Sequence, residues 1–124
     1  MKFVLVGNGS MGSKYSDYLI GNICNKSELC IIDNNPKILK NLNEKGFICY
    51  ESFSKLPKEH KILYGIVANW GPDHLSSAEE LINRGCKRLI IEKPISNNLS
   101  ELNNFKNKFE KDIFITIHHF LRYT

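Results

Sequence analysis

A glycine pattern near the start of the chain is of a type that binds phosphate. It reads Gly7-Asn8-Gly9-Ser10-Met11-Gly12, after an apolar run and before a helix-period segment. In this setting the first glycine permits a tight turn, the second lets a pyrophosphate approach the backbone, and the third lets the helix pack close to the strand. Free N–H groups at the helix start would bind the phosphates. We predict that all six residues contact a dinucleotide; the alternative is a structural turn that binds no ligand.

A carboxylate follows the second apolar run, where a ribose-binding residue is expected. Asp33 lies about twenty residues beyond the glycine pattern, and an acidic side chain there accepts the hydroxyl groups of the adenosine ribose. Asp33 would repel the extra phosphate of NADP, and the loop after it contains no Arg, only Lys37 nearby. The sequence therefore predicts NAD as the cofactor, with Asn34 also in the site. The alternative is that Asp33 caps a helix, although Asn34 and Asn35 could do so instead.

Three later segments also follow apolar runs and carry polar or aromatic side chains. They are Asn69-Trp70-Gly71-Pro72-Asp73-His74, Glu92-Lys93-Pro94 and His118-His119-Phe120-Leu121-Arg122-Tyr123. With these segments, the whole chain resembles the glucose–fructose oxidoreductase / inositol dehydrogenase (Gfo/Idh/MocA) family. The most specific part of the resemblance is Glu92-Lys93-Pro94. The first segment departs from the family's usual Thr-Pro-Asn but keeps the His, and the last has Phe120 where a polar residue is usual.

The resemblance implies roles in each segment. It places Lys93 beside the nicotinamide and the substrate, where it would act as the catalytic residue by bonding a substrate hydroxyl and helping to move its proton. The remaining residues that it assigns to the cofactor site are Asn69, Trp70, His74, Glu92, Pro94 and Arg122, together with Lys93 itself. The alternatives are a surface cation for Lys93, packing under the loop for Trp70 and a helix-start position for His74. We interpret His118 and His119 as strand-end and packing residues rather than acid–base groups.

Alternating apolar runs and helix-period segments predict the elements that position these residues. Strands are expected at 2–6, 29–32, 47–50, 62–68, 88–91 and 113–117, and helices at 11–24, 36–45, 72–84 and 98–111. Asn35 is the expected cap of the second helix, and Gly46 and Gly85 are expected helix stops. The strands are continuous apolar runs, which is typical of a parallel sheet covered on both faces. The order predicts an α/β doubly wound parallel sheet (Rossmann fold) with three layers and about six strands.

Composition limits the remaining function classes. The chain has 124 residues, enough for one domain, and a formal net charge of +4. Its basic residues are scattered, which argues against a nucleic-acid partner. The cysteines lack metal-ligand spacing, so no metal site is expected, and Cys30, Cys49 and Cys86 are predicted to be buried free thiols. Because there is no signal peptide or membrane-length apolar run, a cytoplasmic protein without a membrane partner is expected.

The resemblance also implies a second domain that carries the substrate pocket, the acid–base residues and the oligomer interface. We expect residues 1–124 to be the NAD-binding domain alone, without the C-terminal substrate domain. The parent protein would be an oxidoreductase acting on a sugar, nucleotide sugar or cyclitol by hydride transfer at a hydroxyl-bearing carbon, and this chain alone would be inactive. A carbohydrate-like substrate and a homo-oligomer, formed through the missing domain or an exposed seam, are the expected partners. The alternative is a stand-alone, non-catalytic NAD-binding sensor or partner module.

Overall fold

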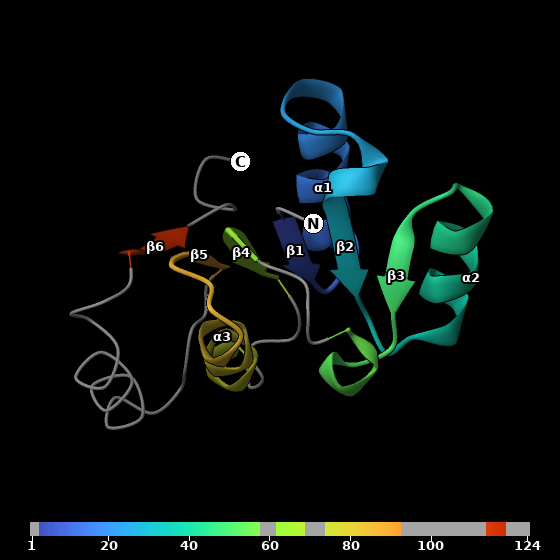
Figure 1. Ribbon diagram of the computed structural model, residues 1–124. Helices are drawn as coiled ribbons and strands as arrows, with labels where there is room; N and C mark the ends of the chain where they lie inside the picture. The colour runs from blue at the N-terminus through green and yellow to red at the C-terminus, as the bar shows by residue number, and fades with distance from the viewer. Residues whose placement is uncertain (1–2, 58–61, 69–73, 93–113, 119–124) are drawn as a thin grey trace.

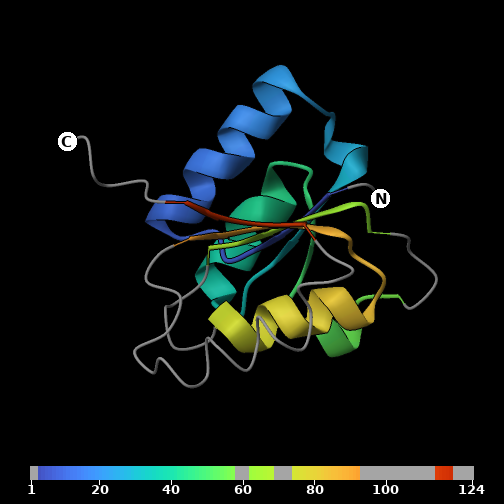
Figure 2. The same ribbon diagram turned by 90° about the vertical axis from the view of Figure 1, so that its left-hand side faces the viewer.

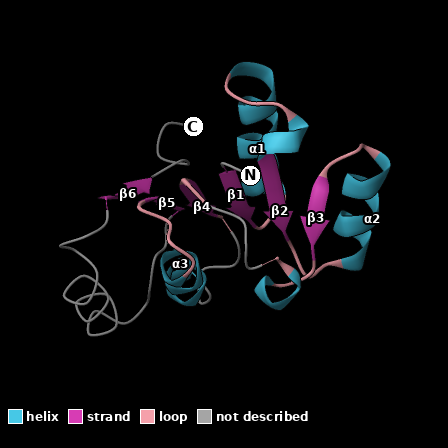
Figure 3. Cartoon of the chain, viewed as in Figure 1, coloured by secondary structure: helices cyan, strands magenta, loops and turns pink. Residues whose placement is uncertain are grey.

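The computed structural model describes residues 3–57, 62–68, 74–92 and 114–118 (Figure 1). Its strands are β1 (Phe3–Val6), β2 (Leu29–Ile32), β3 (Ile48–Tyr50), β4 (Tyr64–Val67), β5 (Arg88–Glu92) and β6 (Phe114–His118). Its helices are α1 (Ser10–Asn22), α2 (Pro36–Glu44) and α3 (His74–Asn83), with short 3-10 turns η1 (Lys26–Glu28) and η2 (Phe53–Lys55). Only the backbone is described for residues 10, 11, 74, 75, 92 and 114–118. Figure 3 shows the alternation of strand and helix along the chain.

The strands form one parallel sheet, so the predicted fold is confirmed. The six strands lie in the order β3-β2-β1-β4-β5-β6, and every neighbouring pair is parallel. The chain moves outward from β1 to β3, crosses back to β4 beside β1, and then moves outward the other way. This is the order of a doubly wound sheet, in which ligands bind where the direction reverses.

Side chains from both faces of the sheet enter separate cores. Val4 and Val6 belong to a cluster that includes Ala78 and Leu81 of α3. Leu5 lies between them in sequence but belongs to the opposite cluster, with side chains from α1 and α2. Figure 2 shows α1 and α3 on opposite sides of the sheet. Because both faces are covered, the strands need apolar residues at every position, which explains their continuous apolar runs.

The buried face of α1 differs from the predicted stripe. The apolar residues at helical spacing in this segment, Met11, Tyr15, Tyr18 or Leu19, and Ile23, predict an inward-facing stripe. Leu19 is buried as predicted, but Tyr18 and Ile23 are 60% and 56% exposed. Gly12 and Ser16 are buried as well, and they recur with Leu19 at helical spacing on one face. Tyr18 lies on another face of the helix, and Ile23 follows the last residue of α1, so neither reaches the core.

Helix ends agree well with the sequence-based predictions. The side chain of Asn35 accepts a hydrogen bond of 2.9 Å from the N–H of Lys37, as expected for the cap of α2. Gly46 and Gly85 follow the ends of α2 and α3 at the predicted stops. The turn η1 was not predicted. The predicted helix at 98–111 lies outside the described residues.

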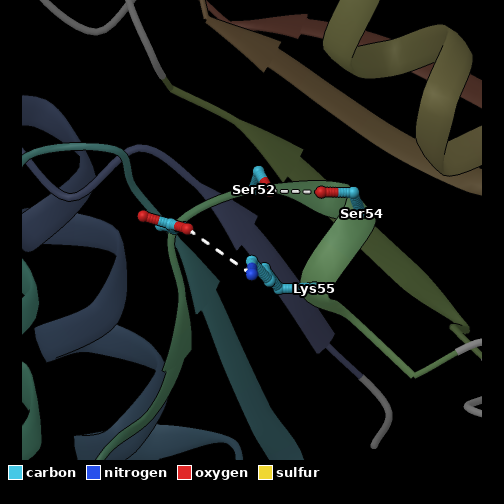
Figure 4. A network of polar contacts seen from close by, with 4 residues as sticks. Ser52, Ser54 and Lys55 are labelled. Carbon is cyan, nitrogen blue, oxygen red and sulfur yellow. Dashed lines mark hydrogen bonds and ion pairs between the residues drawn. The ribbon is translucent and has the colours of Figure 1, made fainter.

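The connection from β3 to β4 carries a small set of exposed polar contacts. The hydroxyl groups of Ser52 and Ser54 lie 2.7 Å apart and face one another in Figure 4. Lys55 forms an ion pair with Glu51 at 4.0 Å, with both side chains at least 60% exposed. Exposed ion pairs of this kind contribute little to stability because water and salt screen them.

A stronger tie joins the same connection to α3. Arg84, just beyond α3, donates hydrogen bonds to the carbonyl oxygens of Phe53 at 2.6 Å and Leu56 at 3.4 Å. Its guanidinium group also lies 6.0 Å from the centre of the Phe53 ring. Since Leu56 is buried in the core beneath, these bonds hold the whole turn η2 against the domain.

The cysteines are free, and the prediction for their burial is correct for two of three. Cys30 and Cys86 are 0% and 1% exposed. Cys49 was predicted to be buried but is only half-buried, because β3 is an edge strand of the sheet. Burial raises the pKa of the Cys30 thiol to about 12. The described part of the chain holds no helix that is long and apolar enough to cross a membrane.

Candidate dinucleotide-binding site

The candidate site lies where the sheet reverses its winding, between β1 and β4. Both strands end there side by side, with Val6 opposite Val67. The glycine loop joins β1 to α1, which lies on one face of the sheet, whereas α3 lies on the other face (Figure 2). The N–H of Ala68 donates a 2.8 Å hydrogen bond to the Val6 carbonyl, so the two strand ends are tied together. Such a crevice outside the carboxyl ends of parallel strands is the usual ligand position in this fold.

The first and third glycines of the loop are required by the protein itself. Gly7 has a φ of 93°, which residues with a side chain rarely adopt. Its N–H donates a 2.7 Å hydrogen bond to the Ile32 carbonyl, which joins the loop to β2. A Cβ on Gly12 would lie 1.8 Å from the Gly7 carbonyl oxygen. The start of α1 therefore packs against the turn more closely than any other residue would allow.

The second glycine differs, because the described residues leave free space beside it. A Cβ on Gly9 would meet no heavy atom of the described part of the chain within 4 Å, and its φ of −73° is open to any residue. Gly9 is the N-cap of α1, and the first turn of α1 contains no acidic residue. The positive end of the helix dipole is thus left open to an anion. The start of α1 could therefore hold an anion such as a pyrophosphate beside Gly9.

Asp33 is fixed at the edge of this space. One carboxylate oxygen accepts a 2.8 Å hydrogen bond from the N–H of Asn8, and the other accepts a 2.9 Å bond from the N–H of Asn35. A carboxylate has about four lone-pair sites, so both oxygens can still accept from ribose hydroxyls. The side chain of Asn35, not Asp33, caps α2. Asp33 therefore joins the glycine loop to the β2–α2 connection and presents a carboxylate where the ribose is expected.

Sequence reasoning missed one polar residue beneath the loop. The hydroxyl of Ser16, which is 3% exposed, lies 3.0 Å from the side-chain oxygen of Asn8 and 3.0 Å from the Ser13 carbonyl. The available signal was its position on α1, since Ser16 stands four residues after Gly12 on the face that Leu19 buries. A serine on a buried helix face needs a hydrogen-bond partner, and here the glycine loop provides one through the side chain of Asn8.

Two surface hollows border α1. One has a volume of about 310 Å³ and lies between the glycine loop and α2; its described lining residues are Asn8, Ser13, Lys37, Ile38, Asn41 and Lys45. The other, of about 480 Å³, follows the outer side of α1; its described lining residues are Lys14, Tyr15, Asp17 and Tyr18. Only the first touches the loop, so the larger hollow does not belong to the candidate site as described.

The remaining predicted site residues are placed only in part. β5 ends at Glu92 and β6 at His118, and these two residues are partners in the parallel register, so their backbones meet at the carboxyl edge of the sheet. The backbone of His74 begins the described part of α3. Asn34 is exposed beside Asp33. The other predicted site residues lie outside the described residues: Asn69, Trp70, Lys93, Pro94 and Arg122. His119, which was interpreted as a packing residue, also lies outside them.

Metal chemistry finds no support in the part of the chain that is described. Within residues 3–57, 62–68, 74–92 and 114–118, no three His, Cys, Asp or Glu side chains are grouped so that they could hold a metal ion. The chemistry available here is instead that of a backbone anion site next to a carboxylate.

Solved structures with the same fold include several dehydrogenases. The chain superposes on myo-inositol 2-dehydrogenase from Lactobacillus plantarum with a TM-score of 0.82 and 16% identity, covering 100% of this chain and 38% of that one. A probable dehydrogenase from Thermotoga maritima gives a TM-score of 0.80 and 18% identity, with coverage of 94% and 35%. The scyllo-inositol dehydrogenase from Lactobacillus casei, solved with NAD(H) and scyllo-inositol, gives 0.78 and 18%, with coverage of 94% and 35%. The chain thus spans little more than a third of the length of these proteins.

The sequence itself identifies the family. No curated protein sequence matches the chain. The family described as "Oxidoreductase family, NAD-binding Rossmann fold" (Gfo/Idh/MocA) matches residues 1–116. This match covers nearly the whole chain, including β1 to β5 and the helices α1, α2 and α3. The chain therefore belongs to this family of NAD-binding oxidoreductase domains.

Proposed function

We propose that this chain is the cofactor-binding part of an oxidoreductase that acts on a sugar, nucleotide sugar or cyclitol. Membership of an NAD-binding oxidoreductase family supports the class of reaction. Inositol dehydrogenases with the same fold support a polyhydroxylated substrate. NAD, when bound, would supply the acceptor for a hydride from a hydroxyl-bearing carbon of that substrate.

The observation that carries this proposal is the empty space beside Gly9. Gly7 and Gly12 are explained by backbone conformation and packing, whereas no atom of the described chain restricts a side chain at Gly9. An unneeded glycine costs conformational entropy. We infer that the space serves a bound pyrophosphate, which N–H groups at the start of α1 would hold, and that Asp33 would accept the ribose hydroxyls.

Roles for the other predicted residues rest on the family resemblance. We propose that Asn34, Asn69, Trp70, His74 and Arg122 border the cofactor. The segment Glu92-Lys93-Pro94 begins at the carboxyl end of β5, which suits a group that acts at the nicotinamide end of the crevice. Lys93 would bond the substrate hydroxyl and help to move its proton.

We further propose that a second domain in the parent protein supplies the substrate pocket and the remaining proton-transfer groups. The length of the structural relatives supports this, because this chain covers only 34–38% of the length of similar solved structures. The 124 residues alone should then give no useful turnover, since positioning of the reactants supplies much of an enzyme's rate. A homo-oligomer of the parent and a cytoplasmic location complete the proposal; four free thiols are typical of a reducing compartment.

The cofactor part of the proposal is tested by calorimetric titration of the chain with NAD and with NADP. We expect tighter binding of NAD, because the Asp33 carboxylate would repel the additional phosphate. Asp33→Asn keeps the shape of the side chain and removes its charge, so the preference for NAD should narrow. Equal affinity of the unaltered chain for both cofactors would contradict the role of Asp33.

Gly9→Ala tests whether the free space holds the cofactor. The new methyl group meets no atom of the residues that the structure describes within 4 Å, so the variant should fold normally. It should bind NAD about five- to 150-fold more weakly, because inserting a methyl group into an occupied contact costs about 1–3 kcal/mol. Gly21→Ala is the matched control: it adds the same methyl group to open space on the exposed part of α1. Unchanged affinity in Gly9→Ala would reject the assigned pyrophosphate position.

The catalytic part requires the full-length parent. Lys93→Met should lower the turnover number by about a hundredfold or more and leave NAD affinity nearly unchanged. Lys93→Arg should not restore turnover, because a guanidinium group stays protonated and differs in shape. Near-normal turnover of Lys93→Met would remove Lys93 from the mechanism.

A further inference from the structure

We propose that the buried hydroxyl of Ser16 is a positioning group for the cofactor: it holds Asn8 in place so that the glycine loop is ordered before NAD binds. This inference rests on the proposed position of the cofactor at Gly9. Ser16 would not touch NAD. Its effect would pass through Asn8, which lies between Gly7 and Gly9 in the loop.

Asn8 is held at two points, one on its backbone and one on its side chain. Its N–H donates to a carboxylate oxygen of Asp33 at 2.8 Å, which fixes the loop to the end of β2. Its side-chain oxygen accepts from the hydroxyl of Ser16 at 3.0 Å, which fixes the loop to α1. Asn8 thus links the two elements that would carry the ribose and the pyrophosphate, and Ser16 provides the link to the helix.

The neighbourhood of Ser16 makes this link specific. The residue is 3% exposed, so water competes poorly for its hydroxyl. The hydroxyl has one hydrogen, shared between the Asn8 side chain and the Ser13 carbonyl one turn back in α1. A serine that bonded only within its own helix would leave Asn8 without this side-chain link to α1. The geometry instead ties the loop to a buried point of the domain.

The expected consequence is pre-organisation of the phosphate-binding loop. Next to the tied Asn8 is Gly9, which adopts many conformations when it is free. If the loop is ordered before binding, the cofactor does not have to supply the free energy for ordering it. Loss of the Ser16 hydroxyl should therefore weaken NAD binding by about three- to tenfold, the range expected for one hydrogen bond.

Ser16→Ala is suited to the test because it should leave the fold intact. The substitution removes one oxygen and adds nothing, and alanine is a better helix former than serine. The gain in helix propensity offsets part of the lost bond, so the melting temperature should change little. Affinity for NAD is measured by calorimetry well below that temperature, on the unaltered chain, Ser16→Ala, Asn8→Ala and the double variant.

The double variant separates positioning from general structural damage. If Ser16 acts through Asn8, Ser16→Ala weakens NAD binding in the natural background and has no further effect when Asn8 is already alanine. If Ser16→Ala binds NAD as the unaltered chain does, the proposal is wrong. It is equally wrong if the substitution weakens binding by the same factor in both backgrounds. Failure of the unaltered chain to bind NAD would instead refute the proposed function, so the two failures are distinguishable.

Discussion

Gly12→Ala should destabilise the domain more than any other single methyl group added to its described glycines. The new Cβ would lie 1.8 Å from the carbonyl oxygen of Gly7 and 2.6 Å from its carbonyl carbon. Real Cβ atoms essentially never approach closer than 3.0 Å, so a gap of more than an ångström would have to open. The obstacle is backbone that is itself hydrogen-bonded to β2, so it cannot rotate away as a side chain would.

The magnitude follows from the kind of atom that has to move. Overpacking a well-packed site commonly costs about 1–3 kcal/mol, and a clash with fixed backbone belongs at the upper end or beyond. We therefore expect a loss of about 3 kcal/mol or more in the free energy of unfolding. For a domain of this size the melting temperature would fall by roughly 10 °C.

Urea unfolding followed by circular dichroism measures this loss, with Gly21→Ala as control. Gly21 is exposed in the same helix, and a Cβ there meets no atom within 4 Å. That variant should be as stable as the natural chain or gain up to about 1 kcal/mol, because alanine is the better helix former. If Gly12→Ala unfolds at the same urea concentration as the natural chain, the tight contact between α1 and the loop is not real.

Three further perturbations have defined outcomes. Gly65→Ala places a Cβ 2.8 Å and 2.9 Å from methyl groups of Leu81 and Leu89, which are ends of flexible side chains. Urea unfolding should therefore show a loss of about 1–2 kcal/mol in the free energy of unfolding, less than for Gly12→Ala. A larger loss than for Gly12→Ala would contradict this ranking. Arg84→Ala removes two hydrogen bonds to the turn η2, so the free energy of unfolding should fall by about 1 kcal/mol and the melting temperature should fall with it. The amides of that turn should also exchange hydrogen faster. An unchanged exchange rate would show that Arg84 does not hold the turn. Burial raises the pKa of the Cys30 thiol to about 12, and the thiolate is the form that reacts with alkylating reagents. Cys30 should therefore resist alkylation at pH 8 until the protein is unfolded. Rapid labelling of the native protein, detected by mass spectrometry, would show that the core around Cys30 opens.

Local sequence signals were sufficient for most of the fold. Continuous apolar runs predicted β2 with its observed bounds, and cap and stop residues such as Asn35 and Gly46 predicted the limits of α2. Each of these signals depends only on residues close to it in sequence, so it can be interpreted without knowing how the rest of the chain folds. Gly7 and Asp33 each follow an apolar run, so the sequence also predicted that both lie at the same edge of the sheet, because neighbouring parallel strands end at one edge.

Errors arose where the outcome depended on what packs from a distance. Tyr18 fitted an apolar stripe but is exposed, since the sheet selects the face of α1 that carries Gly12 and Leu19. Cys49 lies in an apolar run, yet it is only half-buried because its strand is at the edge of the sheet. Periodicity indicates which residues share a face, but not which face another element covers.

The sequence by itself determined the class of fold, the family and the residue types that would meet a dinucleotide, because these depend on local patterns and on spacing along the chain. Only the tertiary structure distinguished the three glycines of the loop: the backbone requires Gly7 and Gly12, whereas no described atom restricts a side chain at Gly9. It also showed that Asp33 and Ser16, from different elements, hold the same residue, Asn8. Such contacts depend on the position of α1 relative to β1 and β2. That position is determined by packing throughout the domain and not by any single segment.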